Sequence, residues 1–483
     1  MMKTLKQAWI AWLWMPVLFS CATYNTKLAG YYNSVAQTDY YRAKSLLEQN
    51  GFLQQDRNRL LYLMEKGKIY HLLGSYDSSN LYLNLADNFL EQKRKTTGDL
   101  IVSNLLNPMM QTYLGEDYER FLLHYYKALN YLYKGQTDEA LVEARRISLS
   151  TQVQQDKFKP NADRYTEDAF ALMVQGMIYE TAGEINNAFI SYRNATDLFL
   201  SAKGPNYYGV TMPEQLKNDL FSTADRMGFT DQIEIYQRKL NRTYTKKEKS
   251  EGGELILFIE RGMAPAKTEQ NFVLMQNGNG NGVFLFNSQY GSFNVPFDFA
   301  AARMSPSSSS LNEFRTVRVA VPSYVPKPYS SAPAVVTLNG TTFKAELAED
   351  INTLAPEILK ERILKEVTAA LTRQLVKKLT EAGASAAARE LVKNNSKEKD
   401  ENKKKRNADA AALTAGLLVN IFNTATEKAD TRNWQSLPAQ IQYVRIPLQK
   451  GANQVSLQLG RNNKNITING NGSIQFYNWA VTN

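Results

Sequence analysis

Cysteine and histidine are almost absent from this chain of 483 residues, which contains one cysteine, Cys21, and two histidines, His71 and His124. A single cysteine excludes an intramolecular disulfide and any zinc site built from several cysteines. Each histidine falls on an expected helix, where packing between helices is a commoner role than metal binding. We therefore predict that the protein has no metal and no other cofactor.

Catalytic motifs are also missing. The sequence contains no Gly-x-Ser-x-Gly elbow, no His-Glu-x-x-His helix and no calcium loop of alternating aspartates. The acidic pairs Glu116-Asp117, Glu167-Asp168 and Glu349-Asp350 lie near expected helix starts, where capping explains them. We predict that the chain is not an enzyme. The alternative is a hydrolase with a dispersed site in the C-terminal half, which would require a cleft lined by converging carboxylates or a Ser–His pair.

Neither nucleic-acid binding nor a membrane span is indicated. The net charge is +10, but both signs are spread along the chain, without a dense basic stripe interleaved with aromatic residues. The apolar run Ala8–Phe19 is too short to span a bilayer. Because it follows Lys3 and Lys6, it is typical of a signal peptide.

The signal segment ends in Leu18-Phe19-Ser20-Cys21, which resembles the lipobox of bacterial lipoproteins. This resemblance implies that residues 1–20 are removed and that Cys21 carries lipid, with acyl chains such as palmitate anchoring the protein to a membrane. By similarity to sorting in Gram-negative bacteria, the absence of aspartate at Ala22 implies the outer membrane. The lack of an acidic cluster there implies its periplasmic side. A plain signal peptide with an incidental cysteine is the alternative.

Three segments between Leu60 and Ala195 share one order of residues: a small residue, an aromatic one turn later, a glycine, and small residues in a second helix. A small residue where two helices touch lets their backbones approach, and glycine suits the left-handed cap at a helix end. The repeat-packing residues are Gly67 and Tyr70 in the first copy, Ala128, Tyr131, Gly135 and Ala140 in the second, and Gly176, Tyr179, Gly183, Ala188, Tyr192 and Ala195 in the third.

This order resembles the tetratricopeptide repeat, a helix–turn–helix of about 34 residues. The copies start at Gly67, Ala128 and Gly176, so extra helices or loops separate them. The resemblance implies a concave groove, lined by residues of the first helices, that binds a partner protein. By position, the candidate groove residues are Met64, Lys68, His71, Tyr125, Leu129, Leu132, Met173, Met177 and Glu180. The alternative is that additional helices fill this face and bury these residues.

The pattern as a whole predicts an α+β protein of several domains. After the signal peptide, the expected units are a lipid-anchored tether and first helix (21–57), an all-α tetratricopeptide-like helical array (58–242), a linker (243–253) and a mixed β-sheet domain (254–483) with an inserted long helical pair at about 351–429. β-Branched and aromatic runs bounded by Gly, Asn and Pro predict the strands. Asn339-Gly340 predicts a tight hairpin between two of them.

The phrase Asp430–Gln442, with Tyr118–Arg145 and Phe170–Ala195, is similar to a poorly characterised family of bacterial lipoproteins. That family joins a tetratricopeptide-like front half to a β-containing rear half, so the resemblance supports the architecture. We expect a scaffold or adaptor in envelope assembly that binds one or more envelope proteins, with peptidoglycan or another glycan as a further candidate partner. A surface glycan-binding or adhesion module is the alternative.

Overall fold

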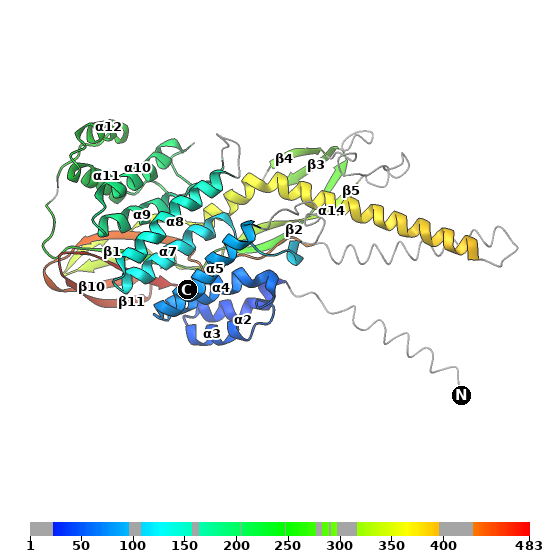
Figure 1. Cartoon of the computed structure of the whole chain (residues 1–483), viewed down its shortest axis with the longest axis horizontal. Helices are drawn as coiled ribbons and strands as arrows, with labels where there is room; N and C mark the ends of the chain where they lie inside the picture. The colour runs from blue at the N-terminus through cyan, green and yellow to red at the C-terminus, as the bar shows by residue number, and fades with distance from the viewer. Residues whose placement is uncertain are drawn as a thin grey trace.

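The computed structural model describes residues 23–95, 108–156, 164–202, 204–246, 248–276, 283–288, 291–296, 316–395 and 428–483. Residues 1–20, Cys21 and most of the second helix expected in the 351–429 insertion lie outside this described part. The chain is α+β: helices make up the first half and three four-stranded sheets lie in the second (Figure 1).

Among the described residues of the first half, five helical hairpins follow one another. In each, three residues connect the two helices. The hairpins are α2 (Tyr24–Ala36) with α3 (Tyr40–Glu48), α4 (Arg59–Leu72) with α5 (Tyr76–Lys95), α7 (Asp117–Tyr133) with α8 (Thr137–Gln155), α9 (Ala169–Thr181) with α10 (Ile185–Ser201), and α11 (Glu214–Arg226) with α12 (Thr230–Leu240).

All five connections use the same backbone turn. Four contain a glycine in the left-handed region, namely Gly74, Gly135, Gly183 and Gly228, with φ between 70° and 80°. Thr38 takes this place in the first hairpin, with φ of 59°. The amide after the glycine donates to the carbonyl five residues earlier, as Gln136 does to Tyr131 (2.9 Å), which satisfies a carbonyl at the helix end.

Small residues allow the helices of a hairpin to approach closely. A Cβ atom added at Gly67 would lie 2.5 Å from Leu83, and one added at Gly176 would lie 2.5 Å from Tyr192. Leu83 and Tyr192 stand at the same offset from their glycines. The small residues expected at these helix contacts, Ala128, Ala140, Ala188 and Ala195, are buried, whereas Tyr70 and Tyr131 are only partly covered.

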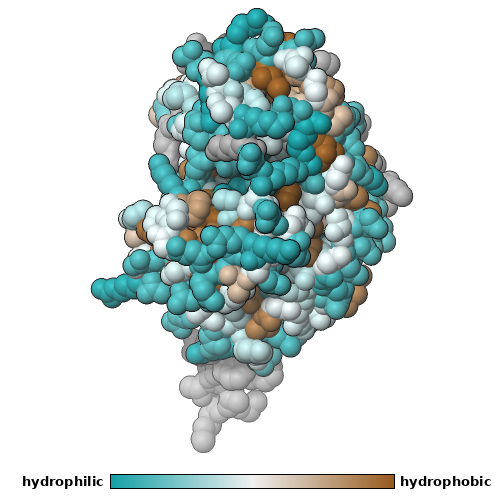
Figure 2. Space-filling model, turned by 90° about the vertical axis from the view of Figure 1, so that its left-hand side faces the viewer, coloured by the Kyte–Doolittle hydropathy of each residue, from teal (hydrophilic) through white to brown (hydrophobic). Residues whose placement is uncertain are grey.

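A tether and one helix were expected in residues 21–57, but the structure has two helices there, α2 and α3. Helix α2 begins at Tyr24, directly after its N-cap residue Thr23, and its buried side chains recur at helical spacing. The helix also contacts the far end of the chain, because the hydroxyl of Thr482 donates to the carbonyl of Val35 (2.8 Å). At the opposite end of the array, α12 buries only Tyr236. Hydrophilic side chains cover most of that end of the molecule (Figure 2).

Two sheets of the second half pack face to face beneath the helices (Figure 1). The sheet next to the array has the order β12-β1-β9-β8, formed by Ile474–Val481, Glu254–Arg261, Gln440–Pro447 and Glu346–Asp350. The outer sheet has the order β11-β10-β6-β7, formed by Asn462–Gly470, Gly451–Leu459, Ala334–Leu338 and Thr341–Lys344. Its β6–β7 turn has φ of 48° at Asn339 and 86° at Gly340, which confirms the expected hairpin.

Strand β1 is buried on both faces because it lies between two layers. Leu255, Leu257 and Ile259 pack into the core between the sheets, while Ile256 and Phe258 pack into the core shared with the helices. Side chains alternate along a strand, so Glu260 shares the helical side with Ile256 and Phe258. The result is a three-layer arrangement of helices, sheet and sheet.

The third sheet packs on a long helix. Its order is β4-β3-β2-β5, formed by Gly291–Pro296, Val283–Ser288, Ala266–Gln276 and Thr316–Val325. One of its faces shares a separate core with Ile363, Val367 and Leu371 of α14 (Ile351–Asn395). The 45 residues of α14 extend well beyond this sheet (Figure 1). The second half was expected to be one mixed domain, but its strands are divided between separate cores.

Candidate functional site

The inner face of the helical array is where the sequence places a groove, and the structure shows that this face is covered. Eight of the nine candidate groove residues are buried and Leu132 is partly buried. The chain's own β12-β1-β9-β8 sheet lies against them, so the expectation of an open groove is corrected: the array already holds part of its own chain.

A buried ion pair joins the array to the centre of this sheet. Lys68 of α4 lies 2.7 Å from the carboxylate of Glu260 on β1, and each side chain is 2% exposed. Glu260 also accepts hydrogen bonds from the hydroxyls of Tyr125 (3.2 Å) and Tyr126 (3.0 Å). Burial alone would raise the pKa of Glu260. The charge of Lys68, with hydrogen bonds from Lys68 and Asn478, outweighs burial and lowers the pKa of Glu260, so the carboxylate stays ionised.

A second charged contact joins the later hairpins to the same sheet. Arg445 of β9 donates to Glu180 of α9 at 2.8 and 3.0 Å and to Asp219 of α11 at 3.1 Å. Burial lowers the pKa of a guanidinium, but the three surrounding carboxylates, Glu254 among them, raise the pKa of Arg445 well above its ordinary value. Glu180, expected in an open groove, therefore holds the sheet in place.

The segment 431–439 lies within the phrase Asp430–Gln442 and runs buried between the helices and the strands. Trp434 is completely buried and packs edge-on against Tyr126. Arg432 donates to backbone carbonyls of Arg57, Pro108 and Gln111 and to the side chain of Asn58, at 2.9 to 3.2 Å. The segment thus contacts several elements at once, and its sequence is explained by these packing and hydrogen-bonding roles.

Two buried acids hold this central segment. Glu65 of α4 accepts hydrogen bonds from the hydroxyls of Tyr31 (2.7 Å), Tyr32 (2.8 Å) and Ser436. Glu119 of α7 accepts from the amide of Trp434 at 2.6 Å. Burial, together with the nearby negative charge of Glu116, raises the pKa of Glu119 to about 8, so this side chain is largely protonated at neutral pH.

Glu116 has the opposite character, although it lies only three residues from Glu119. Lys267 of β2 (2.5 Å) and Arg362 of α14 (2.6 Å) both bind its carboxylate. Burial opposes ionisation, but the charges of these two residues lower the pKa of Glu116 to about 2. This contact fixes the start of α14 and the third sheet to the helical array.

Both histidines are buried, and each is hydrogen-bonded to other side chains. His71 lies 2.7 Å from the side-chain oxygen of Asn130 through Nδ1 and 3.0 Å from the amide nitrogen of Asn478 through Nε2. The first contact requires an N–H on Nδ1, and the second requires a lone pair on Nε2, so the ring is neutral. Burial, with the nearby charge of Lys68, lowers the pKa of His71 to about 4.

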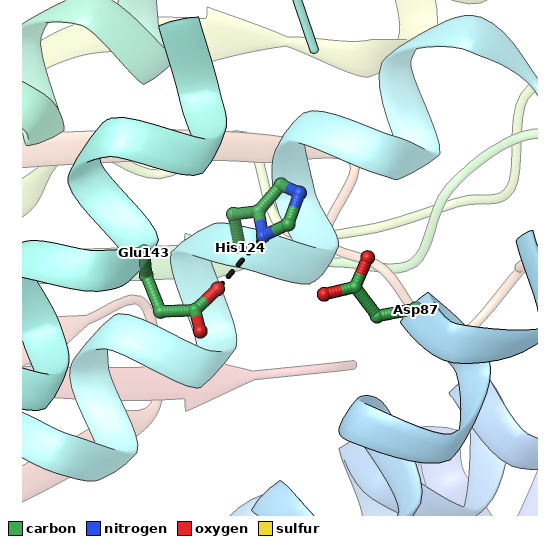
Figure 3. A group of neighbouring side chains, drawn as sticks. All are labelled: Asp87, His124 and Glu143. Carbon is green, nitrogen blue, oxygen red and sulfur yellow. Dashed lines mark hydrogen bonds and ion pairs between the residues drawn. The ribbon is translucent and has the colours of Figure 1, made fainter. Parts of the chain in front are cut away.

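The second histidine belongs to a cluster beside an open pocket (Figure 3). Nδ1 of His124 on α7 lies 2.8 Å from Glu143 of α8, and Asp87 of α5 faces them. These three side chains offer ligand atoms within 4.8 Å of one another. They do not fit a metal, because the ammonium of Lys127 already bridges Asp87 (2.8 Å) and Glu143 (2.9 Å).

Arg146 completes the charge balance of this cluster by binding Asp87 at 2.9 Å. Attraction by His124, Lys127 and Arg146 outweighs burial and lowers the pKa of Asp87, and the pKa of Glu143 is lowered for a similar reason. Two carboxylates therefore face two fixed cations. A divalent ion would add charge to a site that is already balanced.

The adjoining pocket has a volume of about 500 Å³ and lies between α5, α7 and α8. Its apolar lining comes from Leu90, Leu114, Leu123, Leu149 and Val153. Charged side chains of both signs also line it, among them Arg120, Arg146, Glu91 and Asp156. Its size falls in the range of ligand sites. The sequence did not indicate it, because its lining comes from three helices and the apolar residues could equally have been core.

Within the described ranges, no helix is long and apolar enough to cross a bilayer. No protein-family model matches this chain, and no curated protein is significantly similar to it in sequence.

Proposed function

We propose that this protein is a non-enzymatic adaptor of the bacterial envelope, anchored by lipid on Cys21 to the periplasmic side of the outer membrane. A tetratricopeptide-like array would form a rigid body with the β-rich second half. This body would bind an envelope protein through the pocket between α5, α7 and α8. The single observation that carries the proposal is that the inner face of the array is occupied by the chain's own sheet, while this pocket stays open.

The tetratricopeptide-like description rests on the shared geometry of the hairpins. Their three-residue connections and left-handed turns are alike, and Gly67 and Gly176 make equivalent close contacts. Consecutive hairpins also contact one another, as α5 does α7, α8 does α9, and α10 does α11. Such stacking is how helical repeats build an extended wall.

A non-enzymatic role is supported by the state of the reactive groups near the pocket. Asp87 and Glu143 are paired with Lys127 and Arg146 or with His124, so neither carboxylate is poised to take a proton from a bound molecule. An apolar lining flanked by both charges suits a protein segment that inserts apolar side chains and pairs its own charges at the rim.

Mass spectrometry of the protein purified from membranes tests the anchor. We expect a mature N-terminus at Cys21 with diacylglycerol on its sulfur. An unmodified Cys21, or a mature chain that begins elsewhere, would remove the anchor from the proposal. Protease treatment of intact cells tests orientation: degradation before the outer membrane is opened would favour the surface module instead.

Site-specific photocrosslinking in cells tests the pocket. A photoreactive residue at Leu149, which lines the pocket and is 64% exposed, should capture an envelope protein. The matched control is Tyr41 on α3, which is 78% exposed and does not line the pocket. The proposal fails if position 149 captures nothing, or if both positions capture the same proteins.

A further inference from the structure

A small enclosed cavity lies at the start of α9, against β8 and the turn around Tyr207. Its lining includes Tyr165, Asp168, Tyr207 and Glu349. About 10 Å³ of it is open to the centre of a water-sized sphere, which is room for one water molecule or one ion. This cavity shares no lining residue with the pocket between α5, α7 and α8.

Two buried carboxyl groups face the cavity, and they differ in how they are held. Asp168 caps α9 by accepting from the amide of Ala171 (2.6 Å), and it also accepts from the hydroxyl of Tyr165 (2.5 Å). Glu349 is only 7% exposed, and its carboxyl group receives no hydrogen bond from the described residues. A buried carboxylate without a partner is costly, so this group requires an explanation.

Strand geometry directs Glu349 into the cavity. The pairing of β8 with β9 shifts register between Leu347 and Glu349, which is a β-bulge. Successive side chains of a regular strand point to opposite faces, but here both Ala348 and Glu349 line the cavity. Bulges re-aim side chains in this way.

No basic side chain balances the two acids. Among the described residues that line the cavity, none is a lysine, arginine or histidine. Burial raises the pKa of both carboxyl groups, and the charge of Asp168 raises the pKa of Glu349 further. The contrast with Asp87 and Glu143 is direct, because there Lys127 bridges the carboxylates.

We infer that Asp168 and Glu349 bind one hard divalent cation of the calcium class in this cavity. Two carboxylates neutralise its charge and supply up to four oxygen atoms, the ligand type that calcium prefers. The hydroxyl of Tyr165 donates to Asp168, and its oxygen keeps lone pairs that can coordinate a cation. Because Asp168 belongs to the array and Glu349 to the sheet, the ion links the two halves of the protein.

Terbium luminescence on the purified full-length protein tests this site. Tb³⁺ replaces Ca²⁺ at oxygen sites, and the lining tyrosines would sensitise its emission. We expect saturable emission that excess Ca²⁺ displaces. Glu349→Gln should weaken Tb³⁺ binding about tenfold or more, because it removes one of two charged ligands. The matched control is Glu357→Gln, an exposed acid on nearby α14, and it should bind Tb³⁺ like the wild type.

Thermal unfolding provides a second readout. Wild-type Tm should rise with Ca²⁺ and fall with EDTA, whereas Glu349→Gln should respond to neither. Asp168→Asn is the second variant, since asparagine also caps helices well and should preserve the fold. The inference is overturned if both site variants bind Tb³⁺ as tightly as the wild type. It is equally overturned if Ca²⁺ and EDTA leave wild-type Tm unchanged, in which case the acids share a proton.

Discussion

The buried pair between Lys68 and Glu260 joins the helical half to the sheet half, and its removal should be costly. Lys68→Met keeps the length of the side chain and removes the charge. Glu260 would then stay buried, with only two tyrosine hydroxyls and the amide of Asn478 as donors. Breaking one partner of a buried pair costs about 3–5 kcal/mol. Because those donors remain, we expect a loss near the lower end, about 3 kcal/mol.

The double variant Lys68→Met/Glu260→Gln should recover part of this loss. A neutral carboxamide can still accept from the tyrosines, and no charge is left stranded. We expect the double variant to be at least about 1 kcal/mol more stable than Lys68→Met alone, which is a coupling detectable in a double-mutant cycle.

Equilibrium unfolding in urea, followed by tryptophan fluorescence, measures these free energies. Trp434 and Trp479 are the only tryptophans after residue 14, and Trp434 lies between the array and the sheet. The matched control is Lys360→Met, because its pair with Glu357 is about half exposed on both sides and should contribute less than about 1 kcal/mol. The reasoning is refuted if Lys68→Met costs no more than Lys360→Met.

Three further predictions concern single sites. Because burial lowers the pKa of His71 to about 4, unfolding free energy should fall by up to about 3 kcal/mol as pH drops from 6.5 to 4. In His71→Gln, the unfolding free energy measured in urea should depend much less on pH over this range. The imidazole proton NMR signal of His71, identified by its absence from this variant, should not shift in the wild type between pH 8 and 6. Glu119, whose pKa is raised to about 8, should give the opposite pH dependence of stability. The folded state keeps a proton that the unfolded state releases above about pH 4.5, so the unfolding free energy should fall as pH rises toward 8. Urea unfolding at pH 5.5 and 8.5 should show a smaller difference for Glu119→Gln than for the wild type; an equal difference would assign the dependence elsewhere. Gly176→Ala should cost about 1–3 kcal/mol through its clash with Tyr192, whereas Gly51→Ala, which meets no atom within 4 Å, should be nearly neutral in the same assay.

Local patterns in the sequence were sufficient to predict most of the hairpins and most of the strands. The spacing of small residues and glycines located the turns at Gly74, Gly135 and Gly183, each of which has positive φ. Runs of β-branched and aromatic residues bounded by turn residues located most of the strands, and Asn339-Gly340 located a hairpin turn. These features depend on neighbours close in sequence, so a single sequence contains them. Only one helix was expected in residues 21–57, so α2 was missed, although Tyr24, Leu28, Tyr31 and Val35 recur at helical spacing.

The covering of the array could not be predicted in the same way. It depends on Glu260 meeting Lys68 and on Arg445 meeting Glu180, pairs that are 192 and 265 residues apart. No periodicity encodes such pairings. A weak signal did exist in β1, where Leu255–Ile259 is apolar without alternation, as is typical of a strand covered on both faces. Residues that looked like an exposed binding surface were therefore residues of an internal interface.

The contact between Val35 and Thr482 has a consequence for biogenesis. During synthesis α2 is translated long before Thr482, so its native contacts cannot all form until nearly the whole polypeptide has been made. Native contacts between such distant residues form slowly, and the partly folded intermediate exposes hydrophobic surface that is prone to aggregate. Removing even the last few residues should therefore trap the nascent protein incompletely folded at its other end.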